Sequence, residues 1–545
     1  MAWDLSSIYP SDEAYSSDVQ TLKDLLNALE TDEQPLIETY EEACTLCAKL
    51  QSFVSLQLSL DRSNKVFVEE EMHLSLCDPR LKAIYDDFLL GSALPYDPQG
   101  KYSFFIKRLA HAKQHYGSKE TEAMIAHVQR FSGSNWLSLR KEAIQTARSL
   151  EGLSLTAAQA MQAEDDLNKR TAGFAIETEI CESAKDLCCR ALNAIKAQNA
   201  AVAAARGYTS ILDMRLDQEG ISSSFLDGCF QAVESIRPVL LSYALDKQAA
   251  LGEASFRWYL LNHGPKPEAA EPILFEQAMG IICRAFTGFL PEAGALAEEA
   301  RQNQRIDHEK REAKRSGAFC NSIYANNASY VMLTYTDNLR SFISLSHELG
   351  HGVHNRLMHS AGYLGTAAPI TLKEGTAQFF ELLALDALCE QMPTLKKQVV
   401  TMQVTTLSST FLDVTARYLF EREMAENSLS HYYSSQELNG LMLASQKAVL
   451  GELPGATYHP LNWVSKPHFY YTGRAYYNYP YIVGRLIAYH MFSLWKTEGN
   501  ARVVAMLRSS GMCDLGESLR KIGVTDTSGC WEQALCAIRA VIRQI

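Results

Sequence analysis

The chain has 545 residues, of which 47% are hydrophobic and 21% are charged. This composition is ordinary for a globular protein with a large core and excludes a mainly disordered chain. The formal net charge is −12, from 51 basic and 63 acidic residues, and no long basic run is present. We therefore expect no nucleic-acid partner, since binding to phosphates requires a basic surface.

Residues 1–20 are polar and acidic, and they lack the basic start and apolar core of a secretory signal. The most apolar long stretch, 273–290, is interrupted by Glu276, Gln277 and Arg284, which favours a buried helix over a membrane span. The 13 cysteines are scattered through apolar helical patterns, as reduced thiols would be. These features predict a cytoplasmic protein without a membrane partner and leave the oligomeric state open.

Most of the chain carries apolar residues at three- and four-residue spacing, which predicts a mainly α-helical fold. Clear examples are residues 18–30, 182–206 and 375–391. An alanine-rich run begins near residue 190. We place a boundary there, between a helical N-terminal domain of residues 1–190 and a catalytic domain of residues 191–545. The second domain contains every motif whose residues could catalyse a reaction or bind a metal.

One β-strand is predicted at residues 329–335, where β-branched and aromatic residues follow the turn signal Asn326-Asn327. Thr336 or Asp337 could cap the helix that comes next. An extended peptide could pair with the edge of this strand and lie across a metal ion bound to that helix.

The helix after this strand contains an H-E-x-x-H motif, in which His347 and His351 lie one turn apart on the same face. These two imidazoles could bind a metal ion, and Glu348 lies close enough to reach a metal-bound water without binding the metal itself. The alternative is two ordinary helix histidines with a solvated glutamate. However, the expected number of chance H-E-x-x-H motifs in a chain of this length is only on the order of a few hundredths. Gly350 and Gly352 each cost about 1 kcal/mol of helix propensity, so we expect another element to approach this backbone closely.

A catalytic zinc ion usually has three protein ligands, so a third ligand must come from another segment. Glu374 is the best candidate, because it shares one helix face with Gln378 and Glu381. Thr371-x-x-Glu374 is also a capping box that needs no metal, and spacing alone does not decide between the two interpretations. Glu381 is the alternative ligand. His354 could contact substrate or simply pack.

Residues 467–481 contain one histidine and six tyrosines. A tyrosine cluster is usually a packing surface, but peptide hydrolysis needs hydrogen-bond donors aimed at the oxyanion that forms on the attacked carbonyl. Tyrosine hydroxyls and a histidine N–H would suit that role. Tyr477 with Tyr481, or Tyr476 with Tyr479, could share a helix face.

Taken in order, these motifs resemble those of the thimet oligopeptidase group of zinc peptidases, most closely its oligoendopeptidase F branch. The opening Trp3-Asp4-Leu5-Ser6-Ser7-Ile8-Tyr9-Pro10 and the segments 317–320 and 467–471 also resemble that branch. The likeness therefore runs nearly from end to end.

The resemblance implies one zinc ion per chain, with His347, His351 and Glu374 as ligands and Glu348 as general base. The activity it implies is hydrolysis of internal bonds in short, unstructured peptides. The fold it implies is a helical ellipsoid with a deep substrate channel and a small β-sheet beside the zinc-binding helix.

The resemblance also implies that His468 and one or two tyrosines of residues 476–481 stabilise the transition state. Tyr477 and Tyr481 match the pattern of the branch, whereas phenylalanine often stands where Tyr476 and Tyr479 do.

Two other functions remain open. A carboxypeptidase or dipeptidyl carboxypeptidase would use the same zinc helix but needs a clamp for the substrate's C-terminal carboxylate, for which Arg474 and Lys466 are candidates. A non-hydrolytic zinc-containing peptide-binding protein would need no base, so Glu348 argues against it. A fourth ligand that closes the site would favour it, and Cys320 is the candidate.

Overall fold

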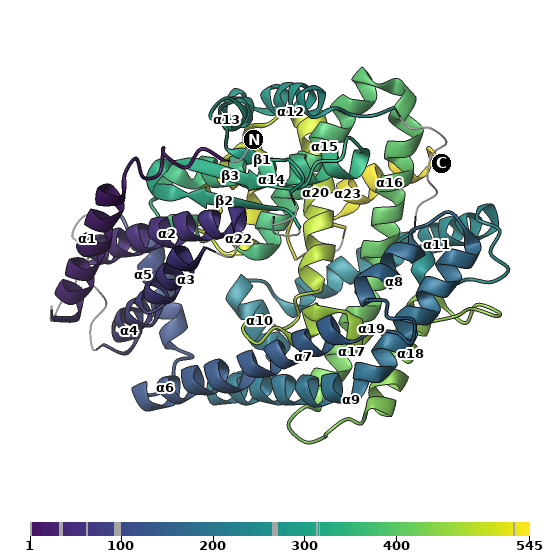
Figure 1. Ribbon diagram of the computed structural model, residues 1–545, viewed down its shortest axis with the longest axis horizontal. Coiled ribbons are helices and arrows are strands. Elements are labelled where there is room, and N and C mark those ends of the chain that lie inside the picture. Colours follow the sequence, from purple (N-terminus) through teal and green to yellow (C-terminus); the bar gives the residue numbers. More distant parts are fainter. Residues whose placement is uncertain are drawn as a thin grey trace. The chain divides into compact units, whose positions relative to one another are not determined.

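The computed structural model describes residues 3–31, 36–61, 64–91, 97, 100–263, 271–311, 314, 317–526 and 529–545. The chain forms two compact units, which we describe separately (Figure 1). Unit 1 comprises residues 1–116, 270–396 and 487–525, and unit 2 comprises residues 117–269, 397–486 and 526–545. The boundary predicted at residue 190 falls inside a helix of unit 2, α9 (Leu167–Ala205), so the spatial units do not follow it.

Unit 1 begins with helices that share one core with the small sheet. This core joins Leu26, Leu50 and Phe88 to Tyr330 and Met332. The helices are α1 (Asp12–Thr31), α2 (Ile37–Leu60), α3 (Lys65–Leu74), α4 (Cys77–Leu90) and α5 (Ser103–Lys113).

The first described residues are fixed to the middle strand of that sheet. Trp3 Nε1 donates to the Val331 carbonyl at 3.0 Å, and the hydroxyls of Ser7 and Tyr330 lie 2.7 Å apart.

The rest of unit 1 holds the sheet and the helices around it. They are α12 (Phe275–Phe289), α13 (Pro291–Gln302), β1 (Ile306–Asp307), β2 (Phe319–Ile323), β3 (Ala328–Met332), α14 (Leu339–Met358), α15 (Ile370–Gln391), α21 (Ala501–Ser509) and α22 (Leu515–Lys521). α20 (Tyr479–Glu498) begins among the residues of unit 2 and ends among those of unit 1.

A mainly helical fold with a small sheet beside the H-E-x-x-H helix is confirmed, since β2 and β3 pack against α14. The ellipsoid outline and its channel stay predictions.

The sheet has the strand order β1-β3-β2. The predicted strand corresponds to β3, which follows a turn at Asn327 (φ 45°). β3 pairs in parallel with β1 and antiparallel with β2, where Cys320 lies opposite Val331. Both edges of β3 are therefore occupied, and the prediction that a peptide pairs with this strand is wrong. Among the described strands, β2 lies at the edge of the sheet next to α14.

α14 carries the H-E-x-x-H motif, and its N-cap is Asn338 rather than Thr336 or Asp337. The Asn338 side chain accepts a hydrogen bond from the Ser341 backbone N–H at 2.9 Å. This bond satisfies one of the free N–H groups of the first turn.

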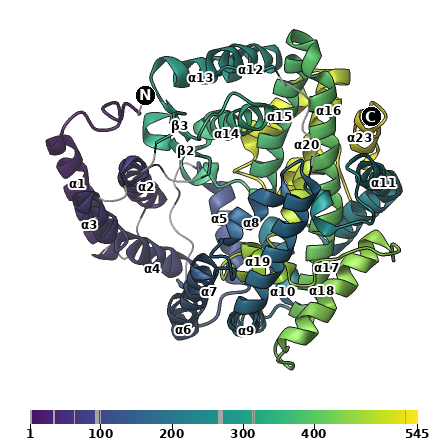
Figure 2. The same ribbon diagram turned by 45° about the vertical axis from the view of Figure 1, so that its right-hand side comes forward.

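Two glycines let neighbouring elements approach α14 closely, as the sequence predicts. A Cβ atom at Gly350 would lie 2.8 Å from Phe380 Cβ in α15, and a Cβ atom at Gly352 would lie 3.1 Å from Ser329 Cβ in β3. α14 and α15 run side by side in Figures 1 and 2. The spacing between these two helices depends on the absence of a side chain at Gly350.

Unit 2 is built around the 39-residue helix α9, and Figure 2 shows α7 and α8 beside it. Its helices are α6 (Lys119–Val128), α7 (Ser134–Thr146), α8 (Leu155–Gln162), α9, α10 (Ile211–Glu219), α11 (Ser223–Ala250), α16 (Lys396–Ser408), α17 (Val414–Glu426), α18 (Ser435–Leu450), α19 (Asn462–Ser465) and α23 (Glu532–Ile542). Its core joins Ile180 and Leu192 of α9 to Phe420, Trp463 and Tyr470. Across the part of the chain that the structure describes, no helix has both the length and the apolar character that a bilayer span requires.

We expect Gly350→Ala to lower the free energy of unfolding by about 1–3 kcal/mol, because the new methyl group would overlap Phe380 in a packed interface. The measurement is the shift of the urea midpoint. Gly288→Ala in α12 is the matched control, since a Cβ atom there would have nothing within 4 Å. The control should be neutral or stabilising by up to about 1 kcal/mol, and equal shifts for both variants would contradict the packing role.

Candidate functional site

His347, His351 and Glu374 meet where α14 packs on α15. The ligand atoms of the three side chains all lie within 4.8 Å of one another. His347 Nε2 is 3.7 Å from Glu374 Oε2, and both side chains are about one-fifth exposed, at 21% and 20%. The three residues form a partly open group of two imidazoles and one carboxylate, the set that the resemblance implies.

Glu381 contacts the other side of the His347 ring. Its Oε1 lies 2.6 Å from His347 Nδ1. A carboxylate accepts the hydrogen bond, so Nδ1 carries a proton, and Nε2 is the nitrogen that could bind a metal in place of its own proton. Glu381 contacts Nδ1 of His347 and is not among the three donors that meet at this group.

The carboxylates around His347 also control its charge. Burial by itself would lower the pKa of His347, but the hydrogen bond to Glu381 and the charges of Glu381, Glu348 and Glu374 raise it to about 9. For His351, burial and the nearby charge of His347 hold the pKa well below its ordinary value. The negative charges that raise the pKa of His347 would equally favour a metal cation.

Glu374 lies inside α15 and does not cap it. The helix begins at Ile370, and its N-cap is Pro369, which has no side-chain hydrogen bond to the helix. Thr371 is fully buried within the first turn. The capping-box interpretation of Thr371 and Glu374 is therefore wrong.

Glu348 is buried beside the metal-binding candidates and contacts the edge strand. Burial raises the pKa of Glu348 to about 7, although the charge of His347 and a hydrogen bond from the Cys320 backbone N–H lower it. A carboxyl group in this range can exchange protons near neutral pH.

Cys320 is not one of the donors that meet at His347, His351 and Glu374. Burial and the charge of Glu348 raise the pKa of its thiol to about 12. Among the described residues this group therefore has three donors, and the fourth ligand of a closed structural site is not provided by Cys320. The backbone contact from Cys320 to Glu348 leaves no signal in the sequence.

His354 packs and does not face the same group. It is 1% exposed, and its Nε2 lies 2.7 Å from Ser510 Oγ. Burial lowers its pKa to about 3, so the ring stays neutral.

In unit 2, His468 gathers with tyrosines from the same segment. The ring centres of His468 and Tyr477 are stacked at 5.8 Å, and Tyr481 lies 5.8 Å from each of them. Tyr471 joins at 5.2 Å from Tyr477. All four side chains are partly exposed, and we call them the tyrosine–histidine cluster. Tyr471 was not singled out from the sequence, because its partners lie at no regular helical spacing from it.

The other tyrosine pair, Tyr476 and Tyr479, is too buried to donate hydrogen bonds to a substrate. Tyr476 is 2% exposed, and Tyr479 is fully buried together with its hydroxyl. Of the two pairs considered from the sequence, the structure leaves Tyr477 and Tyr481 accessible.

Buried contacts fix the segment that carries His468. Arg140 donates to the carbonyls of Val464 and Ser465 at 2.6 and 2.9 Å. Phe469 is fully buried. Burial, together with the charges of Arg417 and Lys466, lowers the pKa of His468 to about 4. His468 is therefore neutral at pH 7 and retains one N–H donor.

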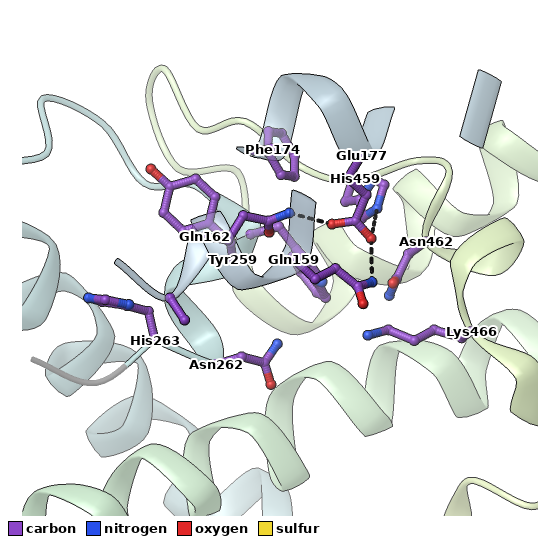
Figure 3. A pocket seen from close by; sticks show the side chains of 12 residues that line it. Gln159, Gln162, Phe174, Glu177, Tyr259, Asn262, His263, His459, Asn462 and Lys466 are labelled. Carbon is purple, nitrogen blue, oxygen red and sulfur yellow. Dashed lines mark hydrogen bonds and ion pairs between the residues drawn. The ribbon is translucent and has the colours of Figure 1, made fainter. Parts of the chain in front are cut away.

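Lys466, a candidate carboxylate clamp, lines a cavity of about 200 Å³ inside unit 2 (Figure 3). Glu177 in this cavity accepts hydrogen bonds from Gln159 at 2.9 Å and Gln162 at 2.6 Å, and it lies 3.5 Å from His459 Nε2. The other candidate, Arg474, is exposed.

Comparison with known proteins identifies related peptidases. Residues 293–533 match peptidase family M3. The chain is 21% identical to oligopeptidase PepF of Bacillus subtilis (strain 168) over 384 residues, which is 65% of this chain but only 57% of that protein. It is also 21% identical to the plasmid-encoded oligoendopeptidase F of Lactococcus lactis subsp. cremoris, over 89% of this chain and 86% of the relative.

Solved structures share the fold over nearly the whole length. A crystal structure of a putative peptidase from Chlamydophila abortus has a TM-score of 0.82 at 20% identity, covering 100% of this chain and 97% of that one. Oligoendopeptidase-F from Enterococcus faecium has a TM-score of 0.65 at 16% identity, covering 98% and 100%. The resemblance to oligoendopeptidase F is confirmed at the level of the fold and the peptidase domain.

We expect His351→Ala to lose zinc, because it removes one of three converging donors. Protein that is stripped, reloaded with zinc and dialysed is assayed for metal by atomic emission. His354→Gln, one turn further along α14, is the matched control and should keep the wild-type zinc content. Full zinc content in His351→Ala would rule out this site.

Proposed function

We propose that this chain is a zinc-dependent oligopeptidase that cuts internal bonds of short, unstructured peptides, because residues 293–533 match peptidase family M3. The observation that carries this proposal is the group of His347, His351 and Glu374, with Glu348 next to it. The printed names of the relatives, oligopeptidase and oligoendopeptidase, support the substrate class. The net charge of −12 agrees with peptide rather than nucleic-acid substrates, and we place the enzyme in the cytoplasm.

The donors at this site fit zinc. Two imidazole nitrogens and one carboxylate are the typical set for a catalytic zinc ion, and Glu381 supplies the carboxylate that usually orients such a histidine. When bound by His347, His351 and Glu374, zinc would act as a Lewis acid that polarises the peptide carbonyl and makes water more acidic.

In this proposal Glu348 moves the proton. It accepts a proton from the attacking water and gives it to the leaving amine. The Cys320 backbone N–H interacts with this carboxylate and lowers its pKa, against the larger effect of burial.

We propose that the substrate backbone pairs with β2 instead of β3. Support comes from the position of β2 at the edge of the sheet and from its packing against α14, the helix that carries Glu348. An extended peptide that adds a strand there would be bound through its main chain.

His468, Tyr477 and Tyr481 are proposed to stabilise the oxyanion. They supply one imidazole N–H and two phenolic O–H groups in a partly exposed cluster. Such donors act most strongly where charge develops in the transition state.

The alternatives have less support. A structural zinc in a peptide-binding protein would need a closing ligand, and Cys320 does not supply it. A carboxypeptidase needs a clamp for the terminal carboxylate, and Lys466 faces a cavity that it shares with the carboxylate of Glu177.

We expect Glu348→Gln to keep its zinc but to lose about 10²- to 10⁴-fold in kcat, because the amide cannot accept the proton. The assay is mass spectrometry of products from a short peptide blocked at both ends. Internal cuts by the wild-type protein alone would support endopeptidase action. If the protein instead cuts only peptides with free ends, and only from the C-terminus, the result would favour a carboxypeptidase.

We expect Tyr477→Phe to lower kcat by about 10²-fold with little change in KM, because the hydroxyl would act mainly in the transition state. Tyr476→Phe is the control, since this neighbouring side chain is buried, and it should keep kcat near the wild-type value. A loss in Tyr476→Phe that equals the loss in Tyr477→Phe would refute the assignment.

A further inference from the structure

A buried carboxylate lies behind the tyrosine–histidine cluster. Glu421, on α17, is fully buried. Its Oε1 accepts a hydrogen bond from the Tyr476 backbone N–H at 2.9 Å, and its Oε2 accepts one from Asn478 Nδ2 at 3.0 Å. The two residues that Glu421 holds are those on either side of Tyr477.

The backbone at this point is in a conformation that needs support. Tyr476 has φ 56°, in the left-handed region that residues other than glycine rarely adopt. α20 starts three residues later at Tyr479, and the Tyr481 N–H donates to the Asn478 carbonyl at 3.2 Å. A change in the backbone at residues 476–478 would therefore redirect both Tyr477 and the start of the helix that carries Tyr481.

The charge on Glu421 is balanced by a residue far away in the sequence. Lys196, on α9, is 1% exposed and forms an ion pair with Glu421 Oε1. All of these residues belong to unit 2. A buried ion pair of this kind contributes little net stability compared with apolar side chains, so it is often retained for specificity of structure.

We propose that Glu421, held by Lys196, is a positioning residue that sets the place of the Tyr477 hydroxyl and thereby the turnover of the enzyme. This inference rests on the proposed function, in which Tyr477 acts on the oxyanion. Glu421 itself is buried and takes no part in the chemistry.

A double-mutant cycle between Glu421→Gln and Tyr477→Phe tests the inference. Glu421→Gln keeps an acceptor for the Tyr476 N–H but loses the charge. In the wild-type background it should lower kcat by about 10-fold with KM nearly unchanged, since a small misplacement of a donor is costly. In the Tyr477→Phe background it should change kcat by less than about twofold, because the positioned hydroxyl is already absent.

Glu253→Gln is the matched control for the loss of a buried charge. Glu253 pairs with Arg170 at 3.1 Å, both side chains are fully buried, and both belong to unit 2. This variant should lower the melting temperature without lowering kcat. If Glu421→Gln does not fold, Asn478→Ala removes one of the two contacts while leaving the ion pair intact, and it should show the same non-additivity.

The possible results separate this inference from the proposed function. Equal fold losses for Glu421→Gln in both backgrounds, or an equal loss of kcat in Glu253→Gln, would overturn the positioning role while the donor role of Tyr477 stands. Wild-type kcat in Tyr477→Phe would overturn the donor role and the positioning role together.

Discussion

The contact between α14 and α15 at Gly350 is the constraint on which the candidate metal site depends. With no side chain at this position, the backbone of one helix lies against Phe380 and Ala377 of the other. At this distance a carboxylate from α15 reaches the imidazoles of α14, and Glu381, two turns after Glu374, reaches the far side of the His347 ring. One close helix contact thus brings two carboxylates of α15, Glu374 and Glu381, to opposite sides of the His347 ring.

Three buried carboxylates among the described residues interact with groups from other elements. Glu381 contacts the His347 ring, Glu348 interacts with the Cys320 backbone N–H, and Glu421 accepts a hydrogen bond from the Tyr476 backbone N–H. Taking a charge out of water is costly unless hydrogen bonds or an opposite charge replace the solvent. Each of these residues has such a partner, and each partner lies in a different element from the carboxylate itself.

The local part of this structure could be predicted from the sequence, and the long-range part could not. Apolar spacing located the helices, and the glycines of the H-E-x-x-H helix indicated a close neighbour because their cost is local. β3 is the central strand because it pairs with β1 on one side. β1 has only two residues, too few to show a periodic pattern, so the sequence did not reveal this pairing. The role of Glu381 required the distance between two helices. Lys196 and Glu421 are 225 positions apart, and nothing in either segment points to the other.

If a substrate peptide pairs with the edge strand β2, as we propose, it would be bound through main-chain groups. Every peptide has the same main chain. A sheet edge that pairs with that main chain therefore accepts many sequences and discriminates little between side chains. A folded protein already uses its own N–H and C=O groups in helices and sheets. Recognition at such an edge therefore selects for the absence of structure in the partner, and the identity of its residues matters only at the few positions where a side chain finds a pocket.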